Sequence, residues 1–121
     1  MTKPLALIIE DDAELADIFS VGLEGIGFET EIARDGKMAL ARLATVVPVL
    51  VLLDLHLPGV SGKDILKHIR ANDRLAGTRV VLATADALMA QSLRGEADLI
   101  LLKPISINHL RSVAKRLLTS S

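Results

Sequence analysis

Several residue types on which common functional sites depend are missing or scarce in this sequence. Its 121 residues include no cysteine, tryptophan or tyrosine and only two phenylalanines, Phe19 and Phe28. The lack of cysteine excludes a disulfide framework and a thiolate metal site, and it agrees with the cytoplasmic location that we expect. The scarcity of aromatic rings excludes nucleic-acid binding by stacking of bases on exposed rings.

A charge excess of either sign is also missing, because 14 basic and 15 acidic residues leave a formal net charge of −1. We therefore expect no direct binding to nucleic acid and no binding to an anionic membrane. The apolar run at residues 5–9 is too short for a signal peptide and far too short to span a bilayer. The 50% hydrophobic composition predicts a single domain, residues 1–121, with its own core.

The most informative stretch of the sequence is Val49–Gly62. It begins with five aliphatic residues, 49–53, which are followed by Asp54 and then by a Pro58-Gly59 turn. A short run of branched aliphatic residues is typical of a strand buried on both faces, and the Pro-Gly pair ends it. We therefore expect Asp54 at the carboxyl end of a buried strand, the edge at which open parallel sheets bind ligands.

Strand-like and helix-like segments alternate five times along the chain. Apolar runs predict strands at residues 5–9, 28–33, 49–53, 79–83 and 99–102. Helical spacing of apolar residues predicts helices between Asp12 and Gly25 and at residues 37–43, 62–72, 85–93 and 107–118. Ile18 in the first helix and Leu118 in the last are among the residues expected to face the core. The alternation predicts an α/β fold, a doubly wound parallel sheet with helices on both faces.

Polar residues follow four of the predicted strands, namely Glu10 and Asp11, Asp54, Thr84 and Lys103. The carboxyl ends of parallel strands meet at one edge, so these side chains are expected to face one crevice. Three carboxylates there would repel one another without a cation, and Mg²⁺ suits oxygen ligands. A lysine and a hydroxyl complete the groups needed to receive a phosphoryl group on an aspartate, since such transfer depends on positioning and charge neutralisation.

The order of these motifs resembles the receiver domain of two-component response regulators, over essentially the whole chain. The residues that carry the resemblance are the acidic pair after the first strand, Asp54 with Leu57-Pro58 and Gly62, Thr84-Ala85 and Lys103-Pro104. The resemblance implies a flavodoxin-like (βα)5 fold with the strand order 2-1-3-4-5. It also implies a cis peptide bond between Lys103 and Pro104, which is common in the family.

The resemblance further implies a role for each polar residue at this edge. Asp54 would be the phosphoacceptor, Thr84 a switch that moves toward the phosphoryl group, and Lys103 the cation that pairs with that group. The implied Mg²⁺ ligands are the side chains of Glu10, Asp11 and Asp54 and the backbone carbonyl group of His56. His56 and Asp86 would occupy positions at which the family tunes how fast the phosphoryl group hydrolyses.

The implied partners are those of a phosphorelay. A histidine kinase or a histidine phosphotransfer protein would donate the phosphoryl group, and a downstream protein target or effector domain would recognise the changed surface. A phosphorylation-dependent dimer is a further expectation. The chain is then a signalling module and not an enzyme.

Three departures from the family pattern leave a second interpretation open. Ile100 stands where the family usually has tyrosine or phenylalanine, and Ile105 stands where phenylalanine is frequent. The segment between Thr84 and Lys103 is about one helical turn shorter than in the family, and the fourth helix absorbs the loss. The alternative function is therefore a constitutive interaction domain of the same fold.

Two further alternatives have less support in the residues. An aspartyl-phosphate hydrolase of the haloacid dehalogenase type needs a second aspartate two positions after its nucleophile, where this chain has His56. Its nucleophile also lies on the first strand, whereas Asp54 follows the third. Flavin binding requires a phosphate loop rich in Ser, Thr and Gly after the first strand, where this chain has acidic residues. Taken singly, Asp12 and its neighbours read as helix-capping acids.

Overall fold

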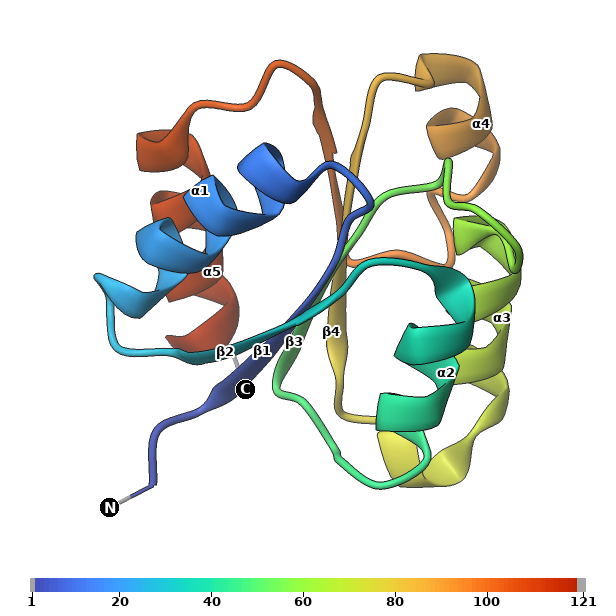
Figure 1. Cartoon of the computed structure of the whole chain (residues 1–121), viewed down its shortest axis with the longest axis horizontal. Coiled ribbons are helices and arrows are strands. Elements are labelled where there is room, and N and C mark those ends of the chain that lie inside the picture. Colours follow the sequence, from blue (N-terminus) through green and yellow to red (C-terminus); the bar gives the residue numbers. More distant parts are fainter. Residues whose placement is uncertain (1, 120–121) are drawn as a thin grey trace.

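A computed structural model describes residues 2–119 and shows a sheet of five parallel strands (Figure 1). The strands are β1 Leu5–Ile9, β2 Glu29–Ala33, β3 Leu50–Leu53, β4 Arg79–Thr84 and β5 Leu99–Leu102. Their order across the sheet is β2-β1-β3-β4-β5, and every neighbouring pair is parallel. The predicted α/β fold and the strand order implied by the family resemblance are therefore confirmed.

Five helices cover the two faces of the sheet, with α1 and α5 on one side and α2, α3 and α4 on the other (Figure 1). The α-helices are α1 Ala13–Glu24, α2 Gly36–Leu43, α3 Gly62–Ala71, α4 Ala87–Ser92 and α5 Ile107–Thr119, and a 3₁₀ turn, η1, covers Asp73–Leu75. Within residues 2–119, no helix has the length and apolar character needed to cross a membrane.

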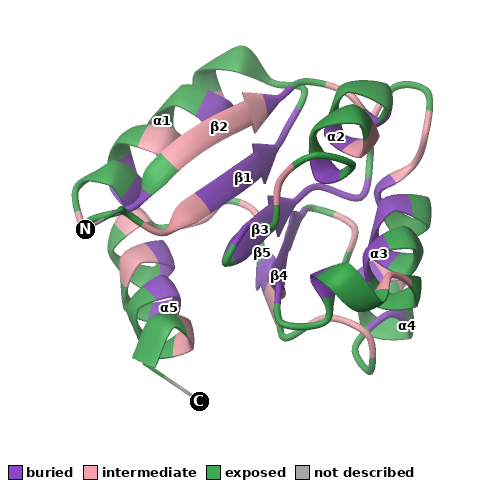
Figure 2. Cartoon of the chain, turned by 90° about the horizontal axis from the view of Figure 1, so that it is seen from below, coloured by how far each residue is buried: buried purple, intermediate pink, exposed green. Residues whose placement is uncertain are grey.

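Each face of the sheet carries its own apolar core, because successive strand residues point to opposite faces. In β1, Leu7 and Ile9 pack beneath the α2, α3 and α4 side, whereas Ala6 and Ile8 pack beneath α1 and α5. The four residues of β3 are all buried, as expected for a central strand covered on both faces. Figure 2 shows β3 and β4 and most of β1 buried between helices whose outer surfaces are exposed, whereas β2, at the edge of the sheet, is only partly buried. This packing holds the strand ends in fixed positions.

Three of the residues that we expect inside the core are exposed. Val49 precedes β3 and is 38% exposed, Ile18 is 42% exposed, and Leu118 near the end of α5 is 38% exposed. In α1 the face that contacts the core is narrower than the helical spacing predicts, and it includes Ala16 and Phe19. A small residue such as alanine lets the helix lie close to the sheet, so a side chain to one side of that face reaches solvent.

The structure shortens the predicted fourth helix. We expected residues 85–93, whereas α4 has six residues and begins after Asp86, whose side chain accepts a hydrogen bond from the Met89 amide. The other helix and strand ends agree with expectation to within one or two residues, as is usual for element boundaries. The 3₁₀ turn η1 follows α3 directly, in the segment that leads to β4.

Candidate functional site

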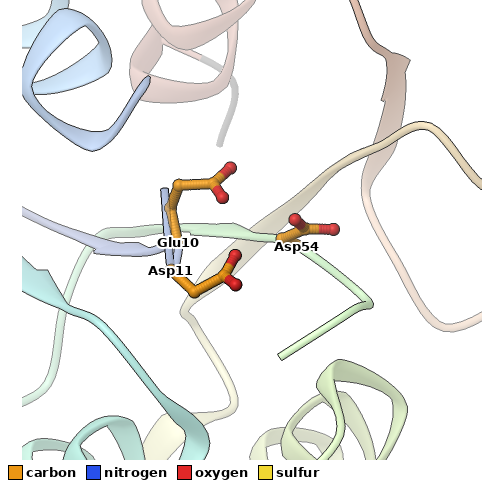
Figure 3. Close-up of side chains that lie close together, drawn as sticks. All are labelled: Glu10, Asp11 and Asp54. Atoms are coloured by element: carbon orange, nitrogen blue, oxygen red, sulfur yellow. The ribbon is translucent and has the colours of Figure 1, made fainter. Parts of the chain in front are cut away.

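The sheet register brings the predicted polar residues together at the carboxyl edge. Ile9 pairs with Leu53 and Leu53 with Leu82, so the residues that follow β1 and β3 lie side by side, close to the end of β4. In the next pair of strands, Thr84 is opposite Leu102, the residue before Lys103. The carboxylates of Glu10 and Asp11 extend toward Asp54 (Figure 3).

Asp54 is buried and held at both carboxylate oxygens. Its backbone amide donates to the carbonyl oxygen of Ile9 at 3.0 Å, and its exposed fraction is only 6%. The His56 amide donates to Oδ1 at 3.2 Å, and the ammonium group of Lys103 donates to Oδ2 at 3.0 Å. The carboxylate therefore has a defined orientation, with a positive charge beside one of its oxygens.

Glu10 shares the same lysine. Lys103 Nζ donates to Glu10 Oε1 at 2.6 Å, and the Asp12 amide donates to Glu10 Oε2 at 3.2 Å. Burial raises the pKa of Glu10, although the hydrogen bond from Lys103 opposes that shift. Burial lowers the pKa of Lys103, but its bonds to Glu10 and Asp54 outweigh that effect and the pKa is raised. Lys103 is therefore a cation at neutral pH.

The three carboxylates form a set that suits a divalent cation. One carboxylate oxygen from each of Glu10, Asp11 and Asp54 lies within 4.8 Å of the others. Glu10 and Asp54 are buried, whereas Asp11 is exposed, so the cluster opens to solvent on one side. Three negative charges against one ammonium group leave an excess that a hard cation with oxygen ligands would neutralise. These residues therefore fit the predicted Mg²⁺ site. The role of the His56 carbonyl group stays a prediction.

Thr84 lies at the end of β4 and is fully buried. Its Oγ1 accepts a hydrogen bond from the Asp86 amide at 3.2 Å. The carboxylate of Asp86 contacts His56 Nε2 at 2.8 Å and caps α4 through the Met89 amide at 3.0 Å. The Met89 and His56 bonds lower the pKa of Asp86. The family resemblance pointed to residues 56 and 86, but nothing in the sequence indicated that these side chains, 30 positions apart, touch each other.

Lys103 and Pro104 are joined by a cis peptide bond, as the family resemblance implies. The Lys103 amide donates to the Thr84 carbonyl oxygen at 2.9 Å, which attaches the end of β5 to the end of β4. Ile100, at the position where the family usually has an aromatic residue, is half-buried against the core on the α4 side. Ile105 packs against the other core, beneath α1 and α5.

The loop after Asp54 depends on a glycine at its far end. The Gly62 amide donates to the Leu55 carbonyl oxygen at 3.1 Å. A side-chain carbon on Gly62 would overlap the Asp54 carbonyl oxygen and lie 2.6 Å from the Leu55 Cα atom. Gly59, in the Pro-Gly turn, has φ = 77°, a conformation that favours glycine. The start of α3 is therefore packed directly against the backbone that carries Asp54.

Comparison with known proteins points to one family. The response regulator receiver domain family matches residues 6–115 of this chain. The DNA-binding response regulator MtrA of Mycolicibacterium paratuberculosis is 37% identical over 107 residues, which cover 86% of this chain and 46% of MtrA. This chain therefore spans about half the length of that relative.

Solved structures give the same result. A signal receiver domain from Vibrio parahaemolyticus is 30% identical, with a TM-score of 0.88 and coverage of 97% of this chain and 91% of that one. Response regulator TrrA from Thermotoga maritima, in complex with Mg(2+)-BeF, is 25% identical with a TM-score of 0.85. The alignment with TrrA covers 94% of this chain and 98% of that one.

Proposed function

This chain belongs to the response regulator receiver domain family, and we propose that it accepts a phosphoryl group on Asp54 in a Mg²⁺-dependent reaction and thereby changes a protein-interaction surface. Receiver domains of response regulators are signalling modules. One observation carries the proposal for this chain. The Asp54 carboxylate lies at the carboxyl edge of the sheet, within reach of both the Lys103 ammonium group and the acidic pair Glu10 and Asp11.

In the proposed reaction an Asp54 carboxylate oxygen attacks the phosphorus atom of a phosphohistidine. The new O–P bond forms as the P–N bond breaks, and the histidine nitrogen keeps the electron pair, so the product is an acyl phosphate on Asp54. Lys103, 3.0 Å from Oδ2, pairs with the charge of the arriving phosphoryl group. The side chains of Glu10, Asp11 and Asp54 and the His56 carbonyl group would hold Mg²⁺, which would supply positive charge against the further negative charge there.

The change of surface is assigned to Thr84 and the segments that follow it. Its hydroxyl group is buried at the end of β4 and bonded to the Asp86 amide. Bonding of this hydroxyl to a phosphoryl oxygen would move residues 84–86 and the start of α4. Ile100 has no hydroxyl group and no ring with which to report that movement. The constitutive interaction domain is therefore the second candidate function.

The proposed partners follow from this chemistry. A histidine kinase or a histidine phosphotransfer protein supplies the phosphoryl group, and a protein target or an effector domain recognises the phosphorylated form, with a phosphorylation-dependent dimer as a further outcome. We place this relay in the cytoplasm. The relative MtrA is a DNA-binding regulator. The formal net charge of −1 gives this chain no overall positive charge to attract nucleic acid, so we assign no direct DNA contact to it.

The test is a measurement of intact mass after incubation with acetyl phosphate and Mg²⁺. We expect the mass of one added phosphoryl group in the wild-type protein, and none in Asp54→Asn or with a chelator present. Asp35→Asn is the matched control, because asparagine still caps α2 and residue 35 follows β2, outside the site. No adduct with acetyl phosphate or with a kinase would contradict the proposal and favour the constitutive domain. Turnover of a phosphate ester that requires Asp54 would favour the hydrolase.

A further inference from the structure

His56 and Asp86 connect three parts of the site that are far apart in the sequence. The backbone amide of His56 bonds to Asp54, while its ring contacts the Asp86 carboxylate at 2.8 Å. The backbone amide of Asp86 bonds to Thr84 Oγ1, while its carboxylate caps α4 at Met89. One chain of hydrogen bonds therefore runs from Asp54 through His56 and Asp86 to both Thr84 and the first turn of α4.

The His56–Asp86 contact crosses between two loops at the mouth of the site. His56 lies in the loop that joins β3 to α3, and Asp86 lies between β4 and α4. Their side chains are 65% and 28% exposed, so solvent or a partner protein can reach the contact. Asp86 is ionised at neutral pH, because the hydrogen bonds to its carboxylate lower its pKa. The ring nitrogen of His56 is therefore the donor in this contact.

The segment after α4 is held by a different residue. Arg70, near the end of α3, donates to the Glu96 carbonyl oxygen at 2.6 Å and to the Asp98 carboxylate at 2.8 Å. Asp98 also accepts a hydrogen bond from the Val80 amide at 2.7 Å. These bonds attach the loop between α4 and β5 to α3 and β4. The start of α4 is held instead by Asp86, and the ring of His56 connects Asp86 to the loop between β3 and α3.

We propose that the His56–Asp86 bridge is a positioning element that holds Thr84 and the start of α4 in the conformation of the unphosphorylated protein. This inference rests on the proposed function of Asp54. For the Thr84 hydroxyl group to move toward a phosphoryl group on Asp54, residues 84–86 must shift, and the bridge resists that shift at Asp86. Its loss therefore moves the equilibrium toward the phosphoryl-binding conformation.

The size of the effect is limited by exposure. A solvent-exposed contact between a histidine ring and a carboxylate contributes little, so we expect removal of the bridge to lower the dissociation constant for a phosphoryl mimic by about two- to fivefold. A ligand gains affinity by this route only if the bridge is stronger in the unbound conformation than in the bound one. An exposed pair that is the same in both conformations would leave the dissociation constant unchanged.

The experiment measures beryllofluoride binding at saturating Mg²⁺ for four variants. His56→Ala removes the ring. Asp86→Ser retains a side chain that can cap α4 but is too short to reach residue 56. The double variant tests whether the two substitutions act through one interaction. His68→Ala is the matched control, because it removes an exposed histidine from the middle of α3.

The binding data and one NMR resonance together test the bridge proposal. Support requires that each single substitution tighten binding about two- to fivefold, that the double variant bind no more tightly than the singles, and that His68→Ala match the wild type. The Met89 amide resonance of unliganded His56→Ala should also shift toward its position in the beryllofluoride complex. Unchanged or weaker binding, or additive effects, would overturn the bridge proposal while the function stands. A wild-type protein that binds no beryllofluoride would instead overturn the proposed function.

Discussion

The strongest steric constraint near Asp54 is the close contact between Gly62 and the segment that follows β3. In a Gly62→Ala variant the new methyl carbon would lie 2.6 Å from the Leu55 Cα atom and 3.0 Å from the Asp54 carbonyl carbon. Both neighbours are backbone atoms, so neither can turn aside as a flexible side chain would. Relief requires α3 to retreat or the backbone of Asp54 to shift.

The expected cost lies at the upper end of the range for overpacked sites, about 3 kcal/mol. A domain of this length has an unfolding entropy of about 0.25 kcal/mol/K near its melting temperature, so the melting temperature should fall by about 12 °C. Differential scanning calorimetry measures this change. Displacement of Asp54 should also slow Mg²⁺-dependent phosphorylation from acetyl phosphate at a temperature at which the variant is still folded.

Gly77→Ala is the matched control for this prediction. A side-chain carbon at Gly77 meets nothing within 4 Å, and its φ is outside the left-handed region. Its replacement should leave stability unchanged or raise it by about 0.4–1 kcal/mol, because alanine restricts the unfolded chain. The reasoning is refuted if Gly62→Ala melts within about 2 °C of Gly77→Ala and is phosphorylated at the same rate.

Two further predictions concern the charges at the site. Lys103→Met leaves two buried carboxylates without their ammonium partner, so the metal-free protein should lose about 2 kcal/mol of stability. Mg²⁺ should restore more stability to this variant than it adds to the wild type in chemical denaturation, and equal increments would contradict the ion-pair argument. Asp86 should titrate below its ordinary pKa of 3.8, first because of the Met89 amide and then because of His56. Its contribution to stability is therefore present above that pH and disappears as the pH falls through the lowered pKa. In carboxyl ¹³C NMR, His56→Ala should raise this midpoint but leave it below 3.8, and an unmoved midpoint would mean that the two side chains do not interact in solution.

The sequence was sufficient to predict the fold because its signals are local and strong. Short aliphatic runs, each followed by a helical spacing of apolar residues, can bury both faces only as a parallel sheet covered by helices. The set of polar residues at the carboxyl edge of the sheet was predictable for the same reason. A residue that directly follows a strand lies at the carboxyl end of the sheet wherever that strand is placed, and Glu10, Asp54 and Lys103 all do so.

Packing details were less accessible from the sequence. Helical periodicity predicts that one face of α1 is buried, but the width of that face depends on how closely the helix approaches the sheet. Ile18 therefore lies in solvent while Ala16 is buried. Val49 belongs to the aliphatic run and its amide donates to the Leu5 carbonyl oxygen, yet the register of β3 with β1 begins only at Leu50.

The sequence by itself determined the elements, the single sheet and the set of polar residues at its carboxyl edge, because periodicity and strand-end position are properties of neighbouring residues. Only the tertiary structure decided which atoms meet there. Lys103 reaches both Glu10 and Asp54, and the His56 ring reaches Asp86 across two loops. Such contacts depend on crossover paths and loop conformations that bring distant segments within hydrogen-bonding distance, and no local pattern in the chain encodes those distances.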